Sequence, residues 1–356
     1  MNTKTFLKLV LPPMLLLSSC GSPPTAATSP ALPTLSSTLT PQEEEIATLN
    51  SLEQVDDHPL YTMRYFGTYA GWASSYGPSD LSKPTIVSAQ TSCRVAWGCS
   101  LFAALDDVED RLLGRNFDWN FSPALLLFTD PADGYASVSM VDIEYLGFEG
   151  ERSKNITSLP LEERRSLLNA PSLPFDGMNE KGLAVGMAAV PAEDMPYDPQ
   201  KKTIGQLEVI REILDHAGTV DEAIEILGSF NIDMGSVSIH YLIASASGES
   251  AVVEFYKGET VIFRNEERWQ TATNFLLADT NGNEQGQCWR YDLIEQRLNM
   301  SGGRVSSRDA FHLLRDVSQE ITQWSVIYHM TSGNVQVVMG RGYSNVHAFR
   351  LEQTDQ

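Results

Sequence analysis

The stretch GCSLFAALDDVEDRLLGRNFDW, residues 98–119, decides the fold. Residues 99–105 are apolar and compatible with a strand, residues 106–110 form a polar turn, and residues 111–119 are typical of a returning strand. This hairpin brings Cys99 close to Arg115. A nearby positive charge favours the thiolate form of a cysteine, which is the nucleophilic form. The pattern therefore predicts a cysteine hydrolase in which Arg115 supplies the positive charge.

Two kinds of group could serve as the base of such an enzyme. The six histidines are scattered without a motif, and one could approach Cys99 in space. The other candidate arises if the chain is cut after Gly98, because the freed α-amino group of Cys99 would have an ordinary pKa of about 7.7–8.0. Asp118 would then orient the ammonium. On the hairpin alone, a buried cysteine without catalytic function, beside an Arg115–Asp118 surface pair, is an equal alternative.

The first 20 residues predict export and a membrane anchor. Lys4 and Lys8 precede a short apolar run, residues 9–17, which is too short to span a bilayer and is typical of a signal peptide. The run ends in LSSCG, residues 17–21, which resembles a bacterial lipobox. We expect Cys20 to be lipidated and the protein to be anchored in the bacterial cell envelope; a plain secretory signal is the alternative.

Residues 21–41 are rich in Pro, Ser and Thr and carry no charge, which is typical of a flexible tether. We expect a pro-segment at residues 42–98 and a catalytic domain at residues 99–356. The net charge of −21 argues against nucleic acid as a partner. No metal or cofactor motif is recognised in the chain. Cys93 and Cys288 could form a disulfide bond in an oxidising compartment.

The pattern of apolar residues predicts alternating strands and helix pairs. Residues 43–55 have a helical pattern, and Thr219 and Ser306 are expected to cap two later helices. Mostly antiparallel strands with two helix pairs predict a layered α/β sandwich. The expected strands are 136–145, 182–190, 237–246, 251–256, 261–264, 269–274, 323–330, 334–339 and 344–351, and the expected helix pairs are 204–216 with 220–227 and 289–300 with 307–317.

Several short motifs, taken with Cys99, resemble the choloylglycine hydrolase family, which includes bile-salt hydrolases and penicillin V acylases and is related to acid ceramidases. The most specific is DGMNEKGL, residues 176–183, and the others are GRNFD (114–118), TN (273–274) and TQWS (322–325). The resemblance runs from Cys99 to about residue 351. It implies the four-layer αββα fold of N-terminal nucleophile hydrolases, and hydrolysis of linear amides through an acyl-enzyme.

The resemblance also implies roles for individual residues. Cys99 would be the nucleophile, freed by self-cleavage of the Gly98–Cys99 bond, and its α-amine the base. Arg115 and Asp118 would hold the thiolate and the ammonium. Asn274 would donate to the oxyanion, and such a donor contributes about 2.7–4 kcal/mol. Arg290 resembles the later active-site arginine of the family.

The chain departs from bile-salt hydrolases in two places. Where those enzymes usually carry Leu-Asn-Phe-Pro, this chain has AAVP, residues 188–191, so Ala189 would offer only its backbone N–H to the oxyanion. Those enzymes also begin almost directly at the cysteine, whereas 98 residues precede Cys99 here. We expect the acyl group of the substrate to lie against apolar residues that follow the hairpin, namely Trp119, Phe121 and residues 125–128, although core packing would explain them equally well.

The predicted function is hydrolysis of a small N-acyl amide by a self-processing, lipid-anchored enzyme. Acyl transfer to an amine through the same acyl-enzyme is one alternative, and a non-catalytic lipoprotein that uses the scaffold for binding is another. The sequence leaves the substrate, the oligomeric state and the fate of the pro-segment open.

Overall fold

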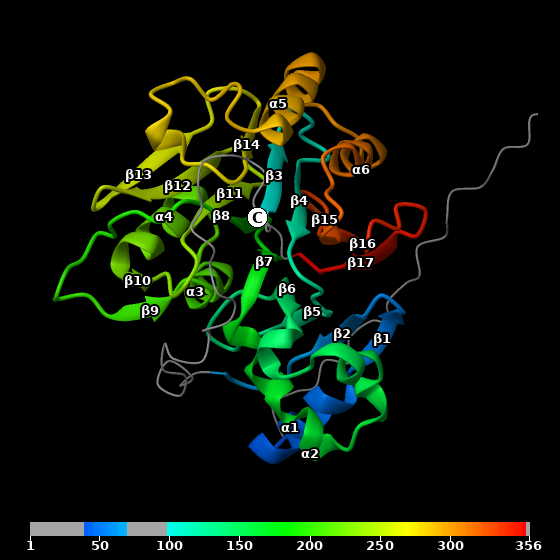
Figure 1. Cartoon of the computed structure of the whole chain (residues 1–356). Coiled ribbons are helices and arrows are strands. Elements are labelled where there is room, and N and C mark those ends of the chain that lie inside the picture. Colours follow the sequence, from blue (N-terminus) through cyan, green and yellow to red (C-terminus); the bar gives the residue numbers. More distant parts are fainter. Residues whose placement is uncertain (1–38, 70–97, 354–356) are drawn as a thin grey trace, which may run out of the picture.

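The computed structural model of the protein describes residues 39–69 and 98–353. The predicted signal peptide, the lipidation site Cys20, most of the tether and Cys93 lie outside the described residues. Two large sheets pack face to face, and a helix pair covers the outer face of each (Figure 1). The predicted αββα sandwich of mostly antiparallel strands is therefore confirmed.

One of the two sheets has nine strands, antiparallel except where β2 runs parallel to β5. The helices α3 (Glu208–His216) and α4 (Val220–Ser229) cover its outer face. In spatial order the strands are β1 (Glu53–Asp56), β2 (Leu60–Arg64), β5 (Ala124–Thr129), β6 (Ser137–Asp142), β7 (Pro174–Asn179), β8 (Leu183–Ala189), β11 (Ile239–Ser245), β12 (Ser250–Tyr256) and β13 (Glu259–Arg264).

The other sheet has six antiparallel strands and carries the predicted hairpin at its centre. The helices α5 (Trp289–Ser301) and α6 (Ser307–Asp316) cover its outer face. In spatial order the strands are β14 (Trp269–Ala272), β3 (Gly98–Ala104), β4 (Leu112–Asp118), β15 (Thr322–His329), β16 (Asn334–Met339) and β17 (His347–Arg350). Cys99 and Leu101 of β3 face the core between the sheets, whereas Phe102 and Ala104 pack toward α5 and α6.

The N-terminal segment shares its core with the rest of the chain. α1 (Pro41–Asn50) is followed by β1 and β2, and β2 lies directly beside β5. Tyr61 is fully buried and donates a hydrogen bond to the carbonyl oxygen of Ser153 at 2.7 Å. The apolar cluster around Tyr61 combines residues from both sides of the Gly98–Cys99 bond, including Leu49, Met63, Leu125 and Phe148.

Most predicted elements are confirmed, and two helices were predicted too long. The helix predicted at 43–55 ends at Asn50, because β1 begins at Glu53. The helix predicted from residue 204 begins at Glu208, since Thr203–Gly205 forms β9 beside β10 (Asn231–Asp233) and the Glu208 carboxylate accepts the Gly205 N–H at 2.7 Å. Thr219 and Ser306 cap α4 and α6 as predicted.

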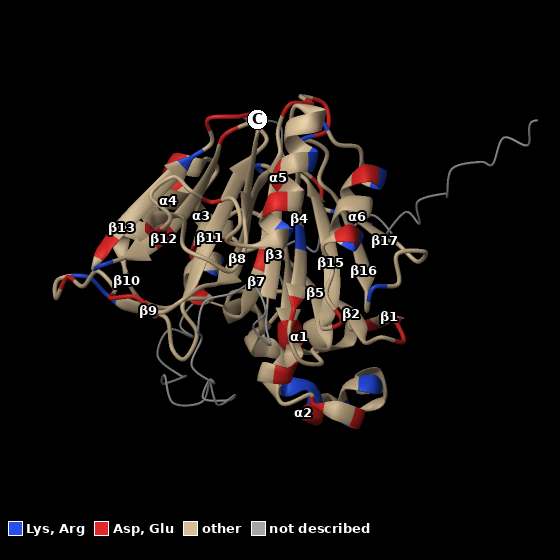
Figure 2. Cartoon of the chain, turned by 45° about the horizontal axis from the view of Figure 1, so that its top comes forward, with Lys and Arg blue, Asp and Glu red and all other residues tan. Residues whose placement is uncertain are grey.

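Acidic and basic residues are spread over several helices and strands of the chain (Figure 2). The short helical segments α2 (Leu161–Arg164) and η5 (Arg165–Ser172) pack beside α1, and η2 (Ile143–Leu146) packs against η5. Within residues 39–69 and 98–353, no helix has both the length and the apolar character needed to cross a membrane.

Candidate active site

Cys99 lies at the start of β3, directly across from Phe117 of β4. It is a free cysteine with 5% of its surface exposed. Paired residues in a sheet project to the same face, so the Cys99 thiol and the Phe117 ring both point into the core between the sheets. Asp118 is paired with Gly98 and projects to the opposite face. The hairpin thus places the thiol and the Asp118 carboxylate on different sides of the six-stranded sheet.

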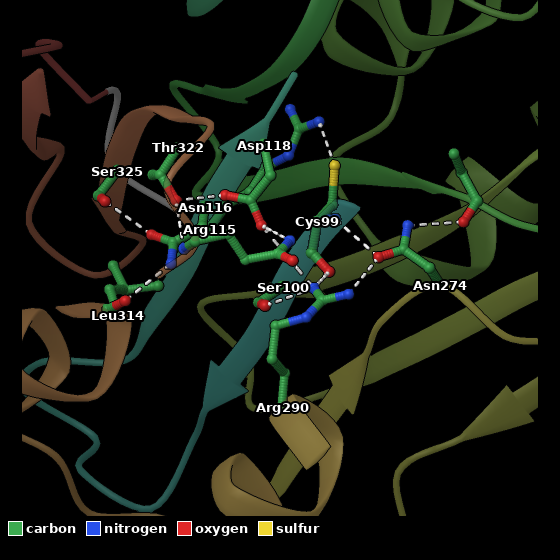
Figure 3. A network of polar contacts seen from close by, with 12 residues as sticks. Cys99, Ser100, Arg115, Asn116, Asp118, Asn274, Arg290, Leu314, Thr322 and Ser325 are labelled. Atoms are coloured by element: carbon green, nitrogen blue, oxygen red, sulfur yellow. Dashed lines mark hydrogen bonds and ion pairs between the residues drawn. The ribbon is translucent and has the colours of Figure 1, made fainter. Parts of the chain in front are cut away.

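Arg115 of β4 lies beside the Cys99 thiol. Its Nη2 lies 3.6 Å from Cys99 Sγ (Figure 3). Its Nη1 donates to the Phe175 carbonyl at 2.8 Å and forms an ion pair with Asp176. Burial would lower the pKa of Arg115, but the Asp176 carboxylate and Cys99 raise it above its usual value. Arg115 therefore stays charged although it is fully buried.

Asp176 is a site residue whose role the sequence did not indicate. It is the first residue of the DGMNEKGL motif and lies on β7, in the sheet opposite Arg115. Its second carboxylate oxygen accepts a hydrogen bond from Tyr328 Oη of β15. Asp176 has no exposed surface, so Arg115 and Tyr328 are positioned by one buried carboxylate.

Asn274 links Cys99 to the opposite sheet. Its Oδ1 accepts the Cys99 backbone N–H at 2.8 Å, and its Nδ2 donates to the Ala189 carbonyl at 2.7 Å (Figure 3). The Val190 N–H donates to the Ser238 carbonyl. Successive residues of a strand direct their N–H and C=O groups to opposite sides, so those of Ala189 point away from Ser238 and toward Asn274. Both predicted oxyanion donors therefore lie on the same side of β8, and Asn274 retains a second N–H to donate.

Arg290 reaches the site from the first turn of α5. It donates to the Cys99 carbonyl, to Ser100 Oγ at 3.0 Å and to Asn274 Oδ1 at 2.7 Å. Arg290 also lies 3.9 Å from Asp118, and Asp118 is fully buried. Arg290 thus positions two groups: the Cys99 carbonyl, and Asn274 Oδ1, which accepts the Cys99 N–H.

Asp118 is held by the turn that leads into β15. Thr322 Oγ1 donates to its Oδ1 at 2.6 Å, and Gln319 Nε2 donates to its Oδ2 at 2.7 Å. Burial raises the pKa of Asp118, although Thr322, Gln319 and Arg290 lower it in part. In this uncut chain the Cys99 N–H donates to Asn274, so the predicted contact of Asp118 with a freed ammonium stays a prediction.

A buried acid anchors the segment that carries Asn274. Glu254 of β12 accepts the backbone N–H groups of Leu277 at 2.9 Å and Ala278 at 3.0 Å, just after Asn274. Its Oε1 also lies 2.9 Å from His240 Nδ1. Both side chains are fully buried. Neither residue belongs to a recognisable motif, so this pair could not be found from the sequence.

None of the six histidines, all of which lie in the described ranges, forms a hydrogen bond with Cys99. Its polar partners are Arg115, Asn274 and Arg290. His240, His329 and His347 are paired instead with Glu254, Asp110 and Asp56. The site geometry therefore gives no support to a histidine base.

The predicted substrate-binding residues are not gathered in one place. Trp119 stacks on Phe117, beside the Cys99 thiol, with ring centroids 6.3 Å apart. Phe128 is a core residue of the cluster that includes Cys99. Phe121 is 41% exposed and lies edge-on to His58. Residues 125–128 belong to the buried strand β5 and alternate between two cores, so Leu125 and Leu127 face away from Cys99.

Cys288 is disulfide-bonded. Its predicted partner Cys93 lies outside the described residues, so the pairing of these two cysteines stays a prediction.

The chain is similar to a known acylase and, in its fold, to known bile acid hydrolases. It is 21% identical, over 206 residues, to the penicillin V acylase of Pectobacterium atrosepticum, covering 53% of this chain and 52% of that protein. The chain thus spans about half the length of this curated relative. Two structures of conjugated bile acid hydrolase variants from Clostridium perfringens share the fold, with TM-scores of 0.51 and 0.50 and identities of 17% and 15%. Each alignment covers 72% of this chain, and 93% and 94% of the respective hydrolase chains.

The sequence model described as acyl-coenzyme A:6-aminopenicillanic acid acyl-transferase matches residues 174–351, half of the 356 residues. This range includes Asp176, Asn274, Arg290 and Thr322. It begins after the hairpin with Cys99, Arg115 and Asp118. The chain therefore belongs to the acyl-coenzyme A:6-aminopenicillanic acid acyl-transferase family, in agreement with its resemblance to the choloylglycine hydrolases.

Proposed function

We propose that the protein is a self-processing cysteine amidohydrolase that cleaves the linear amide bond of an N-acyl compound through a thioester. The observation that carries this proposal is the convergence of Arg115, Asn274 and Arg290 on Cys99, whose side chain, nitrogen and carbonyl oxygen they contact respectively. The backbone N–H and C=O of a buried strand residue are usually paired with neighbouring backbone, whereas here side chains contact both of these groups as well as the thiol.

The first step of the proposal is cleavage of the Gly98–Cys99 bond. Cys99 Sγ, which lies beside the Arg115 guanidinium, attacks the Gly98 carbonyl carbon, and a carbon–sulfur bond forms. The carbon–nitrogen bond breaks, and the thiol proton ends on the Cys99 nitrogen, which becomes a free amine. Water then hydrolyses the thioester, leaving a carboxylate at Gly98 and returning a proton to the sulfur.

The mature enzyme would repeat this chemistry on a substrate amide. The α-amine of Cys99 takes the thiol proton, and the thiolate attacks the acyl carbon. Asn274 Nδ2 and the Ala189 N–H donate to the oxyanion. The ammonium returns its proton to the leaving amine, and water resolves the thioester. Asp118 would hold the ammonium, because its buried carboxylate lies opposite residue 98.

The experiment that tests this proposal is N-terminal sequencing and intact-mass measurement of a chain that begins after the tether, beside its Cys99→Ala variant. We expect a new N-terminus at Cys99 in the parent chain alone. The cut protein is then assayed with penicillin V and with conjugated bile acids, the compounds named for the relatives. Two uncut chains with no amide hydrolysis would favour a binding scaffold instead.

Acyl transfer is a second candidate, and the family name supports it. In that reaction an amine replaces water in resolving the thioester. Adding 6-aminopenicillanic acid or other amines to the hydrolysis assay separates the two functions, since a transferase forms a new amide and a hydrolase releases only the free acid.

For the location we propose export and a lipid anchor at Cys20, supported by the charged start, the apolar run and the lipobox-like ending of residues 1–21. Metabolic labelling with a palmitate analogue tests this. Label that is lost in a Cys20→Ala variant supports the anchor, and label that persists argues against it.

A further inference from the structure

Gly98 is buried at the start of β3, and its backbone does not require glycine. Its φ lies outside the left-handed region, so an L-residue could adopt the same backbone. The constraint is space. A Cβ atom at this position would lie less than 3.0 Å from Gln319 Nε2, a distance that real Cβ atoms essentially never show.

The other neighbours of this Cβ position are less restrictive. Arg290 Nη2 would lie 3.2 Å away and Asn274 Oδ1 would lie 3.3 Å away, so each needs to move only by a few tenths of an ångström. Gln319 is therefore the residue that fills the space of a side chain at position 98.

The end of a glutamine side chain usually moves easily, but here it is tied to a buried acid. Gln319 Nε2 donates to Asp118 Oδ2 at 2.7 Å, and the Gln319 backbone N–H donates to Thr322 Oγ1 at 2.8 Å. Thr322 Oγ1 in turn donates to Asp118 Oδ1 at 2.6 Å. Moving Gln319 aside would break a hydrogen bond to a buried carboxylate, and hydrogen bonds to charged groups are among the stronger ones in proteins.

We propose that Gln319 is the residue that restricts position 98 to glycine during self-cleavage. It acts as a specificity-determining residue for the chain's own scissile bond, by filling the space beside the carbon that Cys99 attacks. This inference rests on the proposed self-cleavage and goes beyond it, because it assigns the glycine requirement to one side chain outside the set that contacts Cys99.

The test is a size-compensation experiment on four chains: the parent, Gly98→Ala, Gln319→Ala and the double variant. Intact mass against time gives each cleavage rate. We expect Gly98→Ala to slow cleavage at least tenfold, and we expect the double variant to recover at least tenfold over Gly98→Ala. Gln323→Ala in the Gly98→Ala background is the matched control. Gln323 bonds to the Trp119 and Ile321 carbonyls and is not among the three nearest neighbours of the position-98 Cβ, so it should give no rescue.

Gln319→Asn serves as a second shortened variant, because it keeps an amide near Asp118. Rescue of Gly98→Ala by either shortened residue supports the inference. The inference is overturned if Gly98→Ala cleaves at the parent rate, if neither double variant recovers, or if Gln323→Ala rescues equally. If both single Gln319 variants fail to cleave, Gln319 is needed for the cleavage chemistry and the space-filling role is overturned. A parent chain that never cleaves refutes the self-processing proposal itself, which distinguishes the two failures.

Discussion

Replacing Asp176 by Asn would test whether a buried carboxylate holds Arg115 charged and in place. Asn has the same shape and can still accept from Arg115 while donating to Tyr328, so the substitution removes mainly the charge. Arg115 and Asp176 both have fully buried side chains, and Asp176 is the carboxylate paired with this arginine. Removing one partner of a buried ion pair costs about 3–5 kcal/mol. We expect the free energy of unfolding at pH 7 to fall by that amount.

The chain offers a matched control in a second buried pair. Arg211 and Asp215 lie 2.7 Å apart with side chains 1% and 8% exposed, and they belong to α3 on the outer face of the nine-stranded sheet. Asp215→Asn should cost a comparable amount in stability. Only Asp176→Asn leaves an uncompensated positive charge beside Cys99, so it should also raise the rate of Cys99 alkylation severalfold, since nearby positive charge makes a cysteine more reactive.

Urea unfolding and alkylation by iodoacetamide at pH 7 measure the two effects. A loss below about 1 kcal/mol in Asp176→Asn would refute the reasoning about the ion pair. An equal rise of the alkylation rate in Asp215→Asn would show that destabilisation, and not charge, exposes the thiol.

Three further predictions follow from other parts of the structure. After self-cleavage the fragment that ends at Gly98 should stay bound on gel filtration under reducing conditions, because β2 lies inside the nine-stranded sheet; its loss without denaturant would contradict this. Burial raises the pKa of Asp142 to about 7, so the folded chain keeps a proton that the unfolded chain, near 3.8, releases. Stability should therefore fall as the pH rises from about 4 to 7, and Asp142→Asn should lessen this fall by up to about 4 kcal/mol in urea titrations; parallel pH curves for the two chains would count against it. Glu254→Ala frees the segment after Asn274 and should reduce amide hydrolysis at least tenfold, with a loss in kcat greater than any change in KM; an unchanged kcat would show that Asn274 needs no such anchor.

The local parts of the site could be predicted from the sequence. The β3–β4 hairpin depends on a short apolar strand, a polar turn and a returning strand, and its register alone places Arg115 on the same face of the sheet as Cys99. The positions of Asn274 and Arg290 were indicated by family motifs and not by pattern, since an asparagine after a strand and an arginine on a helix carry no signal alone.

The long-range partners could not be predicted, because they depend on strand order and register. Asp176 meets Arg115 only because β7 and β4 lie in facing sheets. Thr322 meets Asp118 because a register shift between Thr322 and Trp324 of β15 brings it opposite that residue. Gln319 lies in the turn before this shift, so its contact with Asp118 depends on the same irregularity. β1 and β2 were missed because they are short, and β2 pairs with a strand that follows it by about 60 residues.

The contacts around Cys99 set an order of events in the life of the molecule. Asn274 and Arg290 meet Cys99 across 175 and 191 residues of chain, and Gln319 meets Asp118 across 201. These contacts cannot form until segments that are far apart in the sequence have folded against the β3–β4 hairpin. The proposed cut would therefore occur only in folded molecules. A Cys99 N-terminus would identify a molecule that has already folded, and the uncut fraction in a cell would measure the molecules that have not.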